Sequence, residues 1–552
     1  MKKTITLLAA IAIGQFGFAQ EEMAQTWETK CDHPIQFATG FTSSKGYTYG
    51  SSQKTITIVD NKTGQIKWSK KFDDMAKKLG KVDEIVPLWD ANALFLFDRK
   101  MGKDQMACID VQSGEAMWTS DKYQDVGEDN VIYIPEIEAF ALSLEKGLVM
   151  IKARTGEEIW QTSKLKGFVG SYTYMSDGHL VILNLMPTRG RLRDIFKGFK
   201  NQILKIDVKN GDVVWDADFL GVVERKVVTR QPVVKMKIDN GKIFLELNGV
   251  QVYDYKTGTK IWSCAYDMNI SNIVKAPANA VAWGVYGGVA EPLIVGRDVY
   301  VIDMQSRKKQ FIKKFDLNSG KLLWTSPELY DVKVAPGLYL EGDKLVLQVG
   351  GVVETQAIIE KCTTDPNTHI TTCDRYTKID FPNIKPWRLM CFDANNGKQL
   401  WESEKFKKGI TNAYLLDGKI IACSGKAIYN MDIADGKENY EILLKADKIG
   451  KATKIIPYKD RVIIVGQKGI SEHKPADGSL LMSGKYKTSM LESVEGNILL
   501  MKTPKSDIAA FDLETCKFKK FNARKGATTY LSDEGDFVVV CEKKTITRLS
   551  TK

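Results

Sequence analysis

Histidine is scarce in this chain, and several motifs of catalytic chemistry are missing. The 552 residues include four histidines, His33, His179, His369 and His473, and no two of them have the spacing of metal ligands. This scarcity argues against a zinc or copper centre. The sequence also lacks a serine nucleophile elbow and a phosphate-binding glycine loop, which argues against the hydrolases and nucleotide-binding enzymes that depend on them.

Long hydrophobic runs are absent apart from one short segment at the N-terminus. Lys2 and Lys3 precede the apolar residues 6–13, and residues 17–19 contain the small residues typical of a cleavage site. This order is typical of a secretion signal, so we expect residues 1–20 to be a signal peptide and residues 21–552 to form a β-propeller domain. The apolar run is too short to span a bilayer, and no cysteine near the cleavage point could carry a lipid. The sequence therefore predicts an exported protein of the periplasm or cell envelope without a transmembrane segment, which could reach a membrane only through a partner.

Strong charge of one sign and low-complexity segments are also missing. The net charge of +11 is spread over 552 residues, which gives a mild bias toward anionic partners and not the pattern of a nucleic-acid-binding protein. The hydrophobic content of 43% with 27% charged residues is that of a folded soluble protein. We expect no nucleic-acid partner.

What the sequence has instead is a nine-residue pattern, Asp-x-x-x-Gly-x-x-x-Trp, which recurs behind extended apolar segments. There are seven clear copies, in one of which Lys152 stands in the Asp position. Three weaker copies are centred on Gly436, Gly478 and Cys516. The clear copies have these glycines and tryptophans: Gly64 and Trp68, Gly114 and Trp118, Gly156 and Trp160, Gly211 and Trp215, Gly258 and Trp262, Gly320 and Trp324, and Gly397 and Trp401. Together the clear and weak copies predict ten turns.

Each copy is expected to form a strand, a tight turn and a second strand. Ile56 and Ile58 alternate with polar residues, as in a half-buried strand. The glycine permits a left-handed turn, the Asp can cap free amide groups, and the Trp offers a flat surface to a neighbouring sheet. Unrelated hairpins of a β-sandwich are the alternative, but the fixed spacing from Gly to Trp favours a repeat.

The two ends of the repeat array are complementary. The segment that begins at Trp27 resembles a final strand without its turn, and residues 544–547 resemble a penultimate strand with no final strand after it. We expect these N- and C-terminal strands to share the blade that closes the ring. The predicted fold is all-β, a propeller of four-stranded blades in one large ring of roughly 8 to 11 blades, with two smaller rings as the alternative.

Nine cysteines cannot all pair within the chain. Cys362 and Cys373 flank a polar insertion, where an exported compartment permits a disulfide, although spacing alone does not fix the connectivity. His369 is the only other good ligand nearby, so a metal site is not expected there. Five others lie in apolar runs and are expected to be small core residues: Cys108, Cys264, Cys391, Cys423 and Cys541.

The repeat that ends at Trp68 resembles the PQQ-like (pyrroloquinoline-quinone-like) β-propeller repeat family, and the resemblance covers nearly the whole mature chain. The family contains quinone-dependent dehydrogenases and non-enzymatic propellers such as the BamB-type factor of outer-membrane protein assembly. The resemblance implies that an enzymatic member would hold its cofactor with adjacent cysteines and a calcium site. This sequence has no Cys-Cys pair. We therefore expect a non-enzymatic member of the BamB-like branch, with no catalytic residue, cofactor or metal.

Recognition by a propeller usually comes from loops, and three segments are candidates. Residues 353–387 are expected to cap a blade or to dock a partner, and residues 283–288 are a docking site or an irregular inner strand. Residues 189–200 predict an anionic contact, with a solvated basic loop as the alternative. The side chains of that basic segment are Arg189, Arg191, Arg193, Phe196, Lys197, Phe199 and Lys200.

Taken together, these features predict an exported, non-enzymatic scaffold. Its partner would be a protein or polymer of the bacterial cell envelope, and its role could lie in outer-membrane protein assembly. Two alternatives from other classes are a divergent PQQ-dependent dehydrogenase and a carbohydrate-binding propeller.

Overall fold

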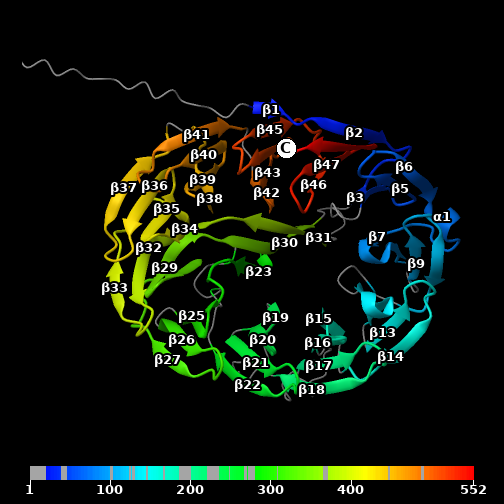
Figure 1. The fold of residues 1–552 in the computed structure, drawn as a ribbon, viewed down its shortest axis with the longest axis horizontal. Helices are drawn as coiled ribbons and strands as arrows, with labels where there is room; N and C mark the ends of the chain where they lie inside the picture. The colour runs from blue at the N-terminus through cyan, green and yellow to red at the C-terminus, as the bar shows by residue number, and fades with distance from the viewer. Residues whose placement is uncertain are drawn as a thin grey trace, which may run out of the picture.

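Eleven sheets are arranged as radial blades in one ring (Figure 1). The structure, a computed structural model, describes residues 20–38, 46–99, 104–123, 126, 131–144, 147–165, 168–185, 201–219, 235–247, 249–265, 270, 276, 280–306, 309–364, 371–445, 448–486 and 490–552. The predicted signal peptide lies outside these residues except for Gln20. Helical structure in the described part is confined to α1 (Phe72–Met75) and two single 3-10 turns, η2 (Trp89–Ala91) and η4 (Pro135–Ile137).

We number the blades in chain order, and within each the strands run from the inside of the ring to its outer wall. Blade 1 is β3 (Phe37–Ala38), β4 (Tyr47–Ser51), β5 (Thr55–Asp60) and β6 (Ile66–Lys71); blade 2 is β7 (Glu84–Leu88), β8 (Ala93–Asp98), β9 (Gln105–Asp110) and β10 (Ala116–Ser120); blade 3 is β11 (Val131–Ile134), β12 (Ala139–Leu144), β13 (Gly147–Lys152) and β14 (Glu158–Thr162). Blade 4 is β15 (Phe168–Met175), β16 (His179–Leu185), β17 (Asn201–Asp207) and β18 (Val213–Phe219); blade 5 is β19 (Lys235–Asp239), β20 (Lys242–Leu247), β21 (Gly249–Asp254) and β22 (Lys260–Ala265); blade 6 is β24 (Leu293–Val295), β25 (Asp298–Ser306), β26 (Lys309–Asp316) and β27 (Leu322–Thr325).

The second half of the ring follows the same plan. Blade 7 is β28 (Gly337–Glu341), β29 (Lys344–Val352), β32 (Asn383–Asp393) and β33 (Gln399–Glu402); blade 8 is β34 (Ile410–Leu416), β35 (Lys419–Ser424), β36 (Ala427–Asp432) and β37 (Glu438–Leu443); blade 9 is β38 (Ala452–Tyr458), β39 (Arg461–Gly466), β40 (Gly469–His473) and β41 (Leu480–Lys485). Blade 10 is β42 (Met490–Glu495), β43 (Ile498–Lys502), β44 (Ile508–Asp512) and β45 (Phe518–Phe521), with β1 (Gln20–Glu22) added outside; blade 11 is β46 (Thr528–Leu531), β47 (Phe537–Glu542), β48 (Thr545–Ser550) and β2 (Gln25–Lys30).

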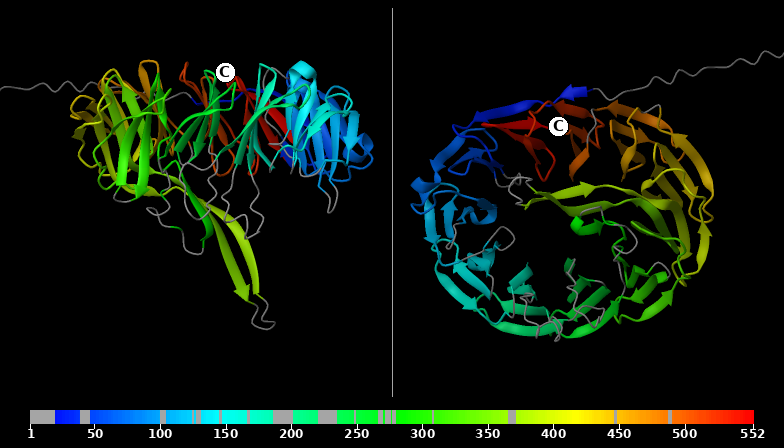
Figure 2. Two further views of the ribbon diagram at one scale, coloured as in Figure 1. Left: turned by 90° about the horizontal axis from the view of Figure 1, so that it is seen from below. Right: turned by 180° about the vertical axis from the view of Figure 1, so that it is seen from behind.

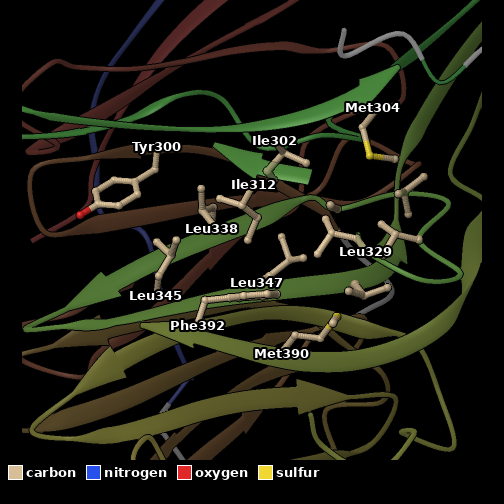
Figure 3. Close-up of a cluster of buried hydrophobic side chains, with 14 of the residues drawn as sticks. Tyr300, Ile302, Met304, Ile312, Leu329, Leu338, Leu345, Leu347, Met390 and Phe392 are labelled. Carbon is tan, nitrogen blue, oxygen red and sulfur yellow. The ribbon is translucent and has the colours of Figure 1, made fainter. Parts of the chain in front are cut away.

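Hydrophobic clusters lie between the blades, one for each neighbouring pair. The cluster between blades 6 and 7 is drawn in Figure 3, where Tyr300, Ile302 and Ile312 approach Leu345 and Leu347. The described residues form eleven such clusters, and the last one joins blade 11 to blade 1. An open array of eleven blades would have one interface fewer, so the ring is closed.

The repeated glycine and tryptophan meet across these interfaces. Trp262 Nε1 donates to the carbonyl of Leu317 in the next blade (2.8 Å), and its ring lies on Gly320. A Cβ on Gly320 would come 2.4 Å from Trp262 Cγ, and its φ of +68° already favours glycine. Eight tryptophans donate in this way, over distances of 2.8 to 3.1 Å: Trp27, Trp68, Trp118, Trp160, Trp215, Trp262, Trp324 and Trp401. The turn glycine is therefore required twice, by its own backbone and by the preceding blade.

The repeated Asp closes its own turn. Asp60 Oδ1 accepts hydrogen bonds from the amides of Lys62 (3.0 Å) and Thr63 (2.8 Å). The same pattern occurs at Asp254 with the amide and hydroxyl of Thr257, and at Asp316 with those of Ser319. These carboxylates are engaged in turn capping, as the sequence predicts.

The two ends of the described chain complete blade 11 together. Strand β2 pairs antiparallel with β48, from Gln25 opposite Leu549 to Lys30 opposite Thr545. Trp27 of β2 donates to the carbonyl of Asn61 in blade 1, as the other repeat tryptophans do for their neighbours. The expected sharing of the closing blade is confirmed, and the ten predicted turns plus this blade account for all eleven.

Candidate docking surface

Two of the three candidate segments come together in one extra sheet outside the blades. This sheet consists of β23 (Ala280–Tyr286), β30 (Glu354–Thr364) and β31 (Thr371–Asp380), with β30 in the centre. It includes residues 283–286 of the third candidate and much of the second. Figure 2 shows that β30 and β31 extend away from one face of the ring as a long hairpin. We call these three strands the projecting sheet.

The base of the projecting sheet is fixed to blades 6 and 7. Trp283 and Val285 of β23 pack against the hydrophobic cluster between these blades. The hairpin leaves blade 7 beyond Gly350, where a Cβ would come 1.8 Å from the carbonyl oxygen of Pro386. At the point of departure the amide of Val353 donates to the carbonyl of Pro382 (3.1 Å), which holds the two arms of the hairpin together.

The two faces of the projecting sheet differ in burial. Residues directly opposite each other in neighbouring strands share a face, so Trp283, Ala357 and Lys378 lie on one face. Ala357, Ile359 and Thr355 on that face are buried, whereas Ile358 and Ile379 on the other face are exposed. Six large hydrophobic side chains on or next to the sheet are 41% to 58% exposed: Val281, Tyr286, Ile358, Tyr376, Ile379 and Phe381. One face is therefore anchored along β23 and β30 and is exposed at Tyr376 of β31, whereas the other face carries exposed Ile358, Ile379 and Tyr286 beside the polar Glu354, Gln356 and Glu360.

Charge on the described part of the hairpin is balanced locally. Lys378 Nζ lies 2.7 Å from an oxygen of Asp380. Near the tip Cys362 is disulfide-bonded, and Cys373 is the residue directly opposite it in the ladder. This register is the one that the predicted Cys362–Cys373 bridge requires. Unlike the basic segment at residues 189–200, the hairpin carries charges of both signs, since Glu354, Glu360, Lys361, Asp374 and Arg375 accompany Lys378 and Asp380.

The basic segment lies outside the described residues. Its side chains are those of Arg189, Arg191, Arg193, Phe196, Lys197, Phe199 and Lys200. The strands on either side, β16 and β17, are the second and third strands of blade 4. In a four-stranded antiparallel blade the last residue of the second strand, here Leu185, and the first residue of the third, here Asn201, lie on the face opposite the Asp-Gly turns. The connection from β29 to β32 that contains β30 and β31 lies on that same face.

The described residues offer little chemistry for a metal or an activated thiol. No group of three or more His, Cys, Asp or Glu in the described ranges is placed to hold a metal ion. Burial raises the pKa of the Cys264 thiol to about 11 and that of Cys391 to about 12, so both are protonated near neutral pH. Seven cysteines of the described residues are buried thiols: Cys31, Cys108, Cys264, Cys391, Cys423, Cys516 and Cys541. Within the same ranges no helix has the length and apolar character needed to cross a membrane.

Besides the added strand β1, two features were missed by sequence reasoning. The first is the pairing of β23 with β30, which joins segments on opposite sides of blade 6 in the chain. The second is the irregular register in the outer strands, usually at the residue before the Trp, such as Ile261 before Trp262. An apolar residue recurs in that position, at Val214, Ile261 and Leu323, and is exposed in each case. This recurrence could have indicated the irregular register from the sequence.

One protein family and several solved structures are similar to this chain. The sequence model of the family described as outer membrane protein assembly factor BamB matches residues 52–164 and 145–284. Among solved structures, BamB from Moraxella catarrhalis shares 14% identity over 72% of this chain and 92% of its own, with a TM-score of 0.28. The C-terminal WD40 domain of Sif2 shares 9% identity over 76% and 96%, with a TM-score of 0.35.

A computationally designed protein, Ika8, shares 12% identity over 69% of this chain and 95% of its own, again with a TM-score of 0.35. These structural likenesses are weak, and nothing about function follows from them. No curated protein sequence matches the chain. The repeated hairpins, the Trp–Gly contacts between blades and the family match over residues 52–164 and 145–284 agree, and the chain resembles the PQQ-like β-propeller repeat family.

Proposed function

We propose that this chain is an exported scaffold of the bacterial cell envelope that binds a protein partner through the projecting sheet. The observation that carries the proposal is the group of exposed apolar side chains Ile358, Ile379 and Tyr286 on one face of this sheet. An exposed apolar cluster on a structure that extends from the ring marks an interaction site better than single apolar residues on a wall. In the blades, by contrast, the large side chains pack against neighbouring blades.

The partner class follows from the family and the predicted export. The matching family is described as outer membrane protein assembly factor BamB, so we propose that the partner belongs to outer-membrane protein assembly. The signal peptide predicted for residues 1–20 would deliver the chain to the periplasm. Mass spectrometry of the mature protein tests this step, and a retained Met1 would contradict it.

We also propose that the chain is not an enzyme. The repeat carboxylates, such as Asp254 and Asp316, are occupied by hydrogen bonds within their own turns. The sequence has no adjacent cysteines of the kind the quinone-dependent members of the family use. Adding the quinone with calcium should produce no dye-linked oxidation of alcohols or sugars, and turnover in this assay would support the dehydrogenase alternative instead.

The main test removes the hairpin from the full-length protein. Residues 354–380 are replaced by a short glycine link between Val353 and Phe381, whose ends are close because the Val353 amide bonds to Pro382. Crosslinking in envelope extract followed by purification should capture a partner with the natural protein and lose it with this variant. The matched control is Val214→Ser, which removes an exposed apolar side chain from the outer wall of blade 4. Capture that survives removal of the hairpin would contradict the proposed surface.

A further inference from the structure

The outer edges of the blades are interrupted almost everywhere. A β-bulge disrupts the ladder and bends the strand, which protects an exposed edge from pairing with another chain. The outer strand of blade 5, β22, shows such a register shift between the pairs formed by Val252 and Tyr253. Ten outer strands have a shift of this kind: β2, β6, β10, β14, β18, β22, β27, β33, β37 and β41.

The exception is the outer strand of blade 10. Strand β45 pairs with β44 without any register shift, from Ile508 opposite Phe521 to Phe511 opposite Phe518. This regular edge is also the one that receives an added strand, since β1 lies parallel to it with Gln20 opposite Phe518. Within the described chain, an outer edge is either bulged or covered.

The inner edges follow a related rule. Four inner strands longer than five residues, β15, β34, β38 and β42, have register shifts. The inner strands whose ladders are regular are short, from the 2 residues of β3 to the 5 residues of β7, β19 and β28. A short regular edge offers too few backbone groups to hold another strand.

Strand β31 is neither bulged nor covered, as the outer edges are, nor short, as the regular inner edges are. Its ladder with β30 is regular over ten pairs, from Thr355 opposite Asp380 to Thr364 opposite Thr371. Its sequence contains no proline, and no other strand among the described residues pairs with its free side. The opposite edge of the same sheet, β23, does have a register shift, between Ala280 and Ala282. Among the edges that the structure describes, β31 is the long, regular and uncovered one.

We propose that β31 binds the partner by strand addition, so that an extended segment of the partner protein becomes the fourth strand of the projecting sheet. This proposal rests on the proposed function and specifies its chemistry. The free edge presents N–H and C=O groups in alternation, and only another polypeptide backbone in extended conformation matches that spacing. The addition of β1 to β45 shows the same event within this molecule.

Side chains on both faces of β31 define the segment that fits. Tyr376 and Ile379 lie on opposite faces of the strand and are both about half exposed. Lys378 is paired with Asp380, so it adds little net charge to the edge. The partner segment should therefore have an apolar residue beside each of these two side chains, on opposite faces of its strand, without a requirement for strong charge.

The first test measures register. In the full-length protein, p-benzoylphenylalanine replaces Tyr376, Lys378 or Asp380 in turn, and the crosslinked partner peptides are identified by mass spectrometry after irradiation in cells. Strand addition predicts that the three positions, two residues apart, crosslink to sites two residues apart along one partner segment. Crosslinks to scattered sites, or to none, would overturn the proposal.

The second test introduces a bulge into β31, like the bulges in the outer strands of the blades. One glycine inserted between Thr377 and Lys378 creates a bulge in β31 and should weaken capture of the crosslinked partner about tenfold or more, with the melting of the ring unchanged. Leu323→Ser on the outer wall of blade 6 is the control and should capture normally. If removal of the hairpin abolishes capture but this insertion does not, strand addition is wrong and the scaffold function stands. If removal of the hairpin leaves capture intact, the proposed function itself fails.

Discussion

The ring and the projecting sheet are built from the same kind of antiparallel strand but use their side chains differently. In blade 2, Leu94, Phe95 and Leu96 follow one another and are all fully buried, because each face of a blade packs on a neighbour. In the projecting sheet Ala357 and Ile359 are buried, whereas Ile358 between them is 41% exposed. A strand that is buried on both faces is committed to the fold, and a strand buried on one face is available for another molecule.

The difference extends to the backbone. The ring ends in outer strands that are bulged or covered, whereas the projecting sheet ends in β31, which is regular over ten pairs. Edge protection is expected wherever pairing with another chain would be harmful. This protection is absent at β31. The strand therefore belongs to the part of the molecule that we expect to meet a partner, whereas the protected edges belong to the ring.

The largest effect on the ring should come from removal of the closing strand. A chain without residues 20–31 loses β2, the Trp27 contact with Asn61, and the buried Cys31. The interface between blades 11 and 1 then opens and the edge of β48 is exposed, so cooperative thermal unfolding should disappear. Differential scanning calorimetry measures this.

Removal of residues 354–380 provides the control for that experiment. It should leave the main unfolding transition of the ring in place, because the hairpin belongs to no blade. An unchanged transition after loss of β2 would show that the ring does not depend on its closure, and the contrast between the two regions would fail.

A smaller effect is expected from one inter-blade contact. Trp262→Ala should cost about 3–5 kcal/mol of unfolding free energy, the usual range for a buried aromatic. Gly320→Ala should cost about 1–3 kcal/mol, because its Cβ would lie 2.4 Å from Trp262 Cγ and its φ is +68°. In the Trp262→Ala background this glycine substitution should cost less, since the clash is gone.

Urea denaturation of the four proteins of this cycle measures the coupling. Ile358→Ala in the projecting sheet is the matched comparison and should change stability by no more than about 0.5 kcal/mol, as expected for an exposed side chain. Strictly additive effects of Trp262 and Gly320 would mean that their contact does not stabilise the ring.

The sequence predicts the ring well because its contacts are repeated. Trp262 and Gly320 belong to different copies, yet their fixed spacing within each copy reveals both the hairpin and the need for a neighbour. The closing role of β2 also follows, because Trp27 occupies the place of a final strand. Each of these predictions uses a pattern seen several times.

The projecting sheet could not be predicted in the same way. Its strands occur once, and the pairing of Trp283 with Ala357 joins segments that blade 6 separates in the chain. Strand β1 was missed for another reason, since Gln-Glu-Glu has no apolar alternation to mark it. The role predicted for the basic segment that includes Arg191 stays a prediction, because the segment lies outside the described residues.

The smallest expected effect concerns the Asp of the repeat and depends on pH. The hydroxyl and amide of Ser319 donate to Asp316, each over 2.7 Å, and with Arg297 they hold the pKa of this carboxyl below its usual 3.8. A group whose pKa falls on folding adds stability that is complete above its unfolded pKa and is lost as the pH falls through the folded pKa. Asp316→Asn should therefore lower the unfolding free energy by about 1 kcal/mol at pH 7, and this difference should shrink below pH 4. Ser319→Ala should give an intermediate pH dependence, because it removes the hydroxyl donor and keeps the amide. If Asp316→Asn changes the unfolding free energy by the same amount at pH 7 and at about pH 2.5, the carboxylate charge does not contribute to the stability of the turn.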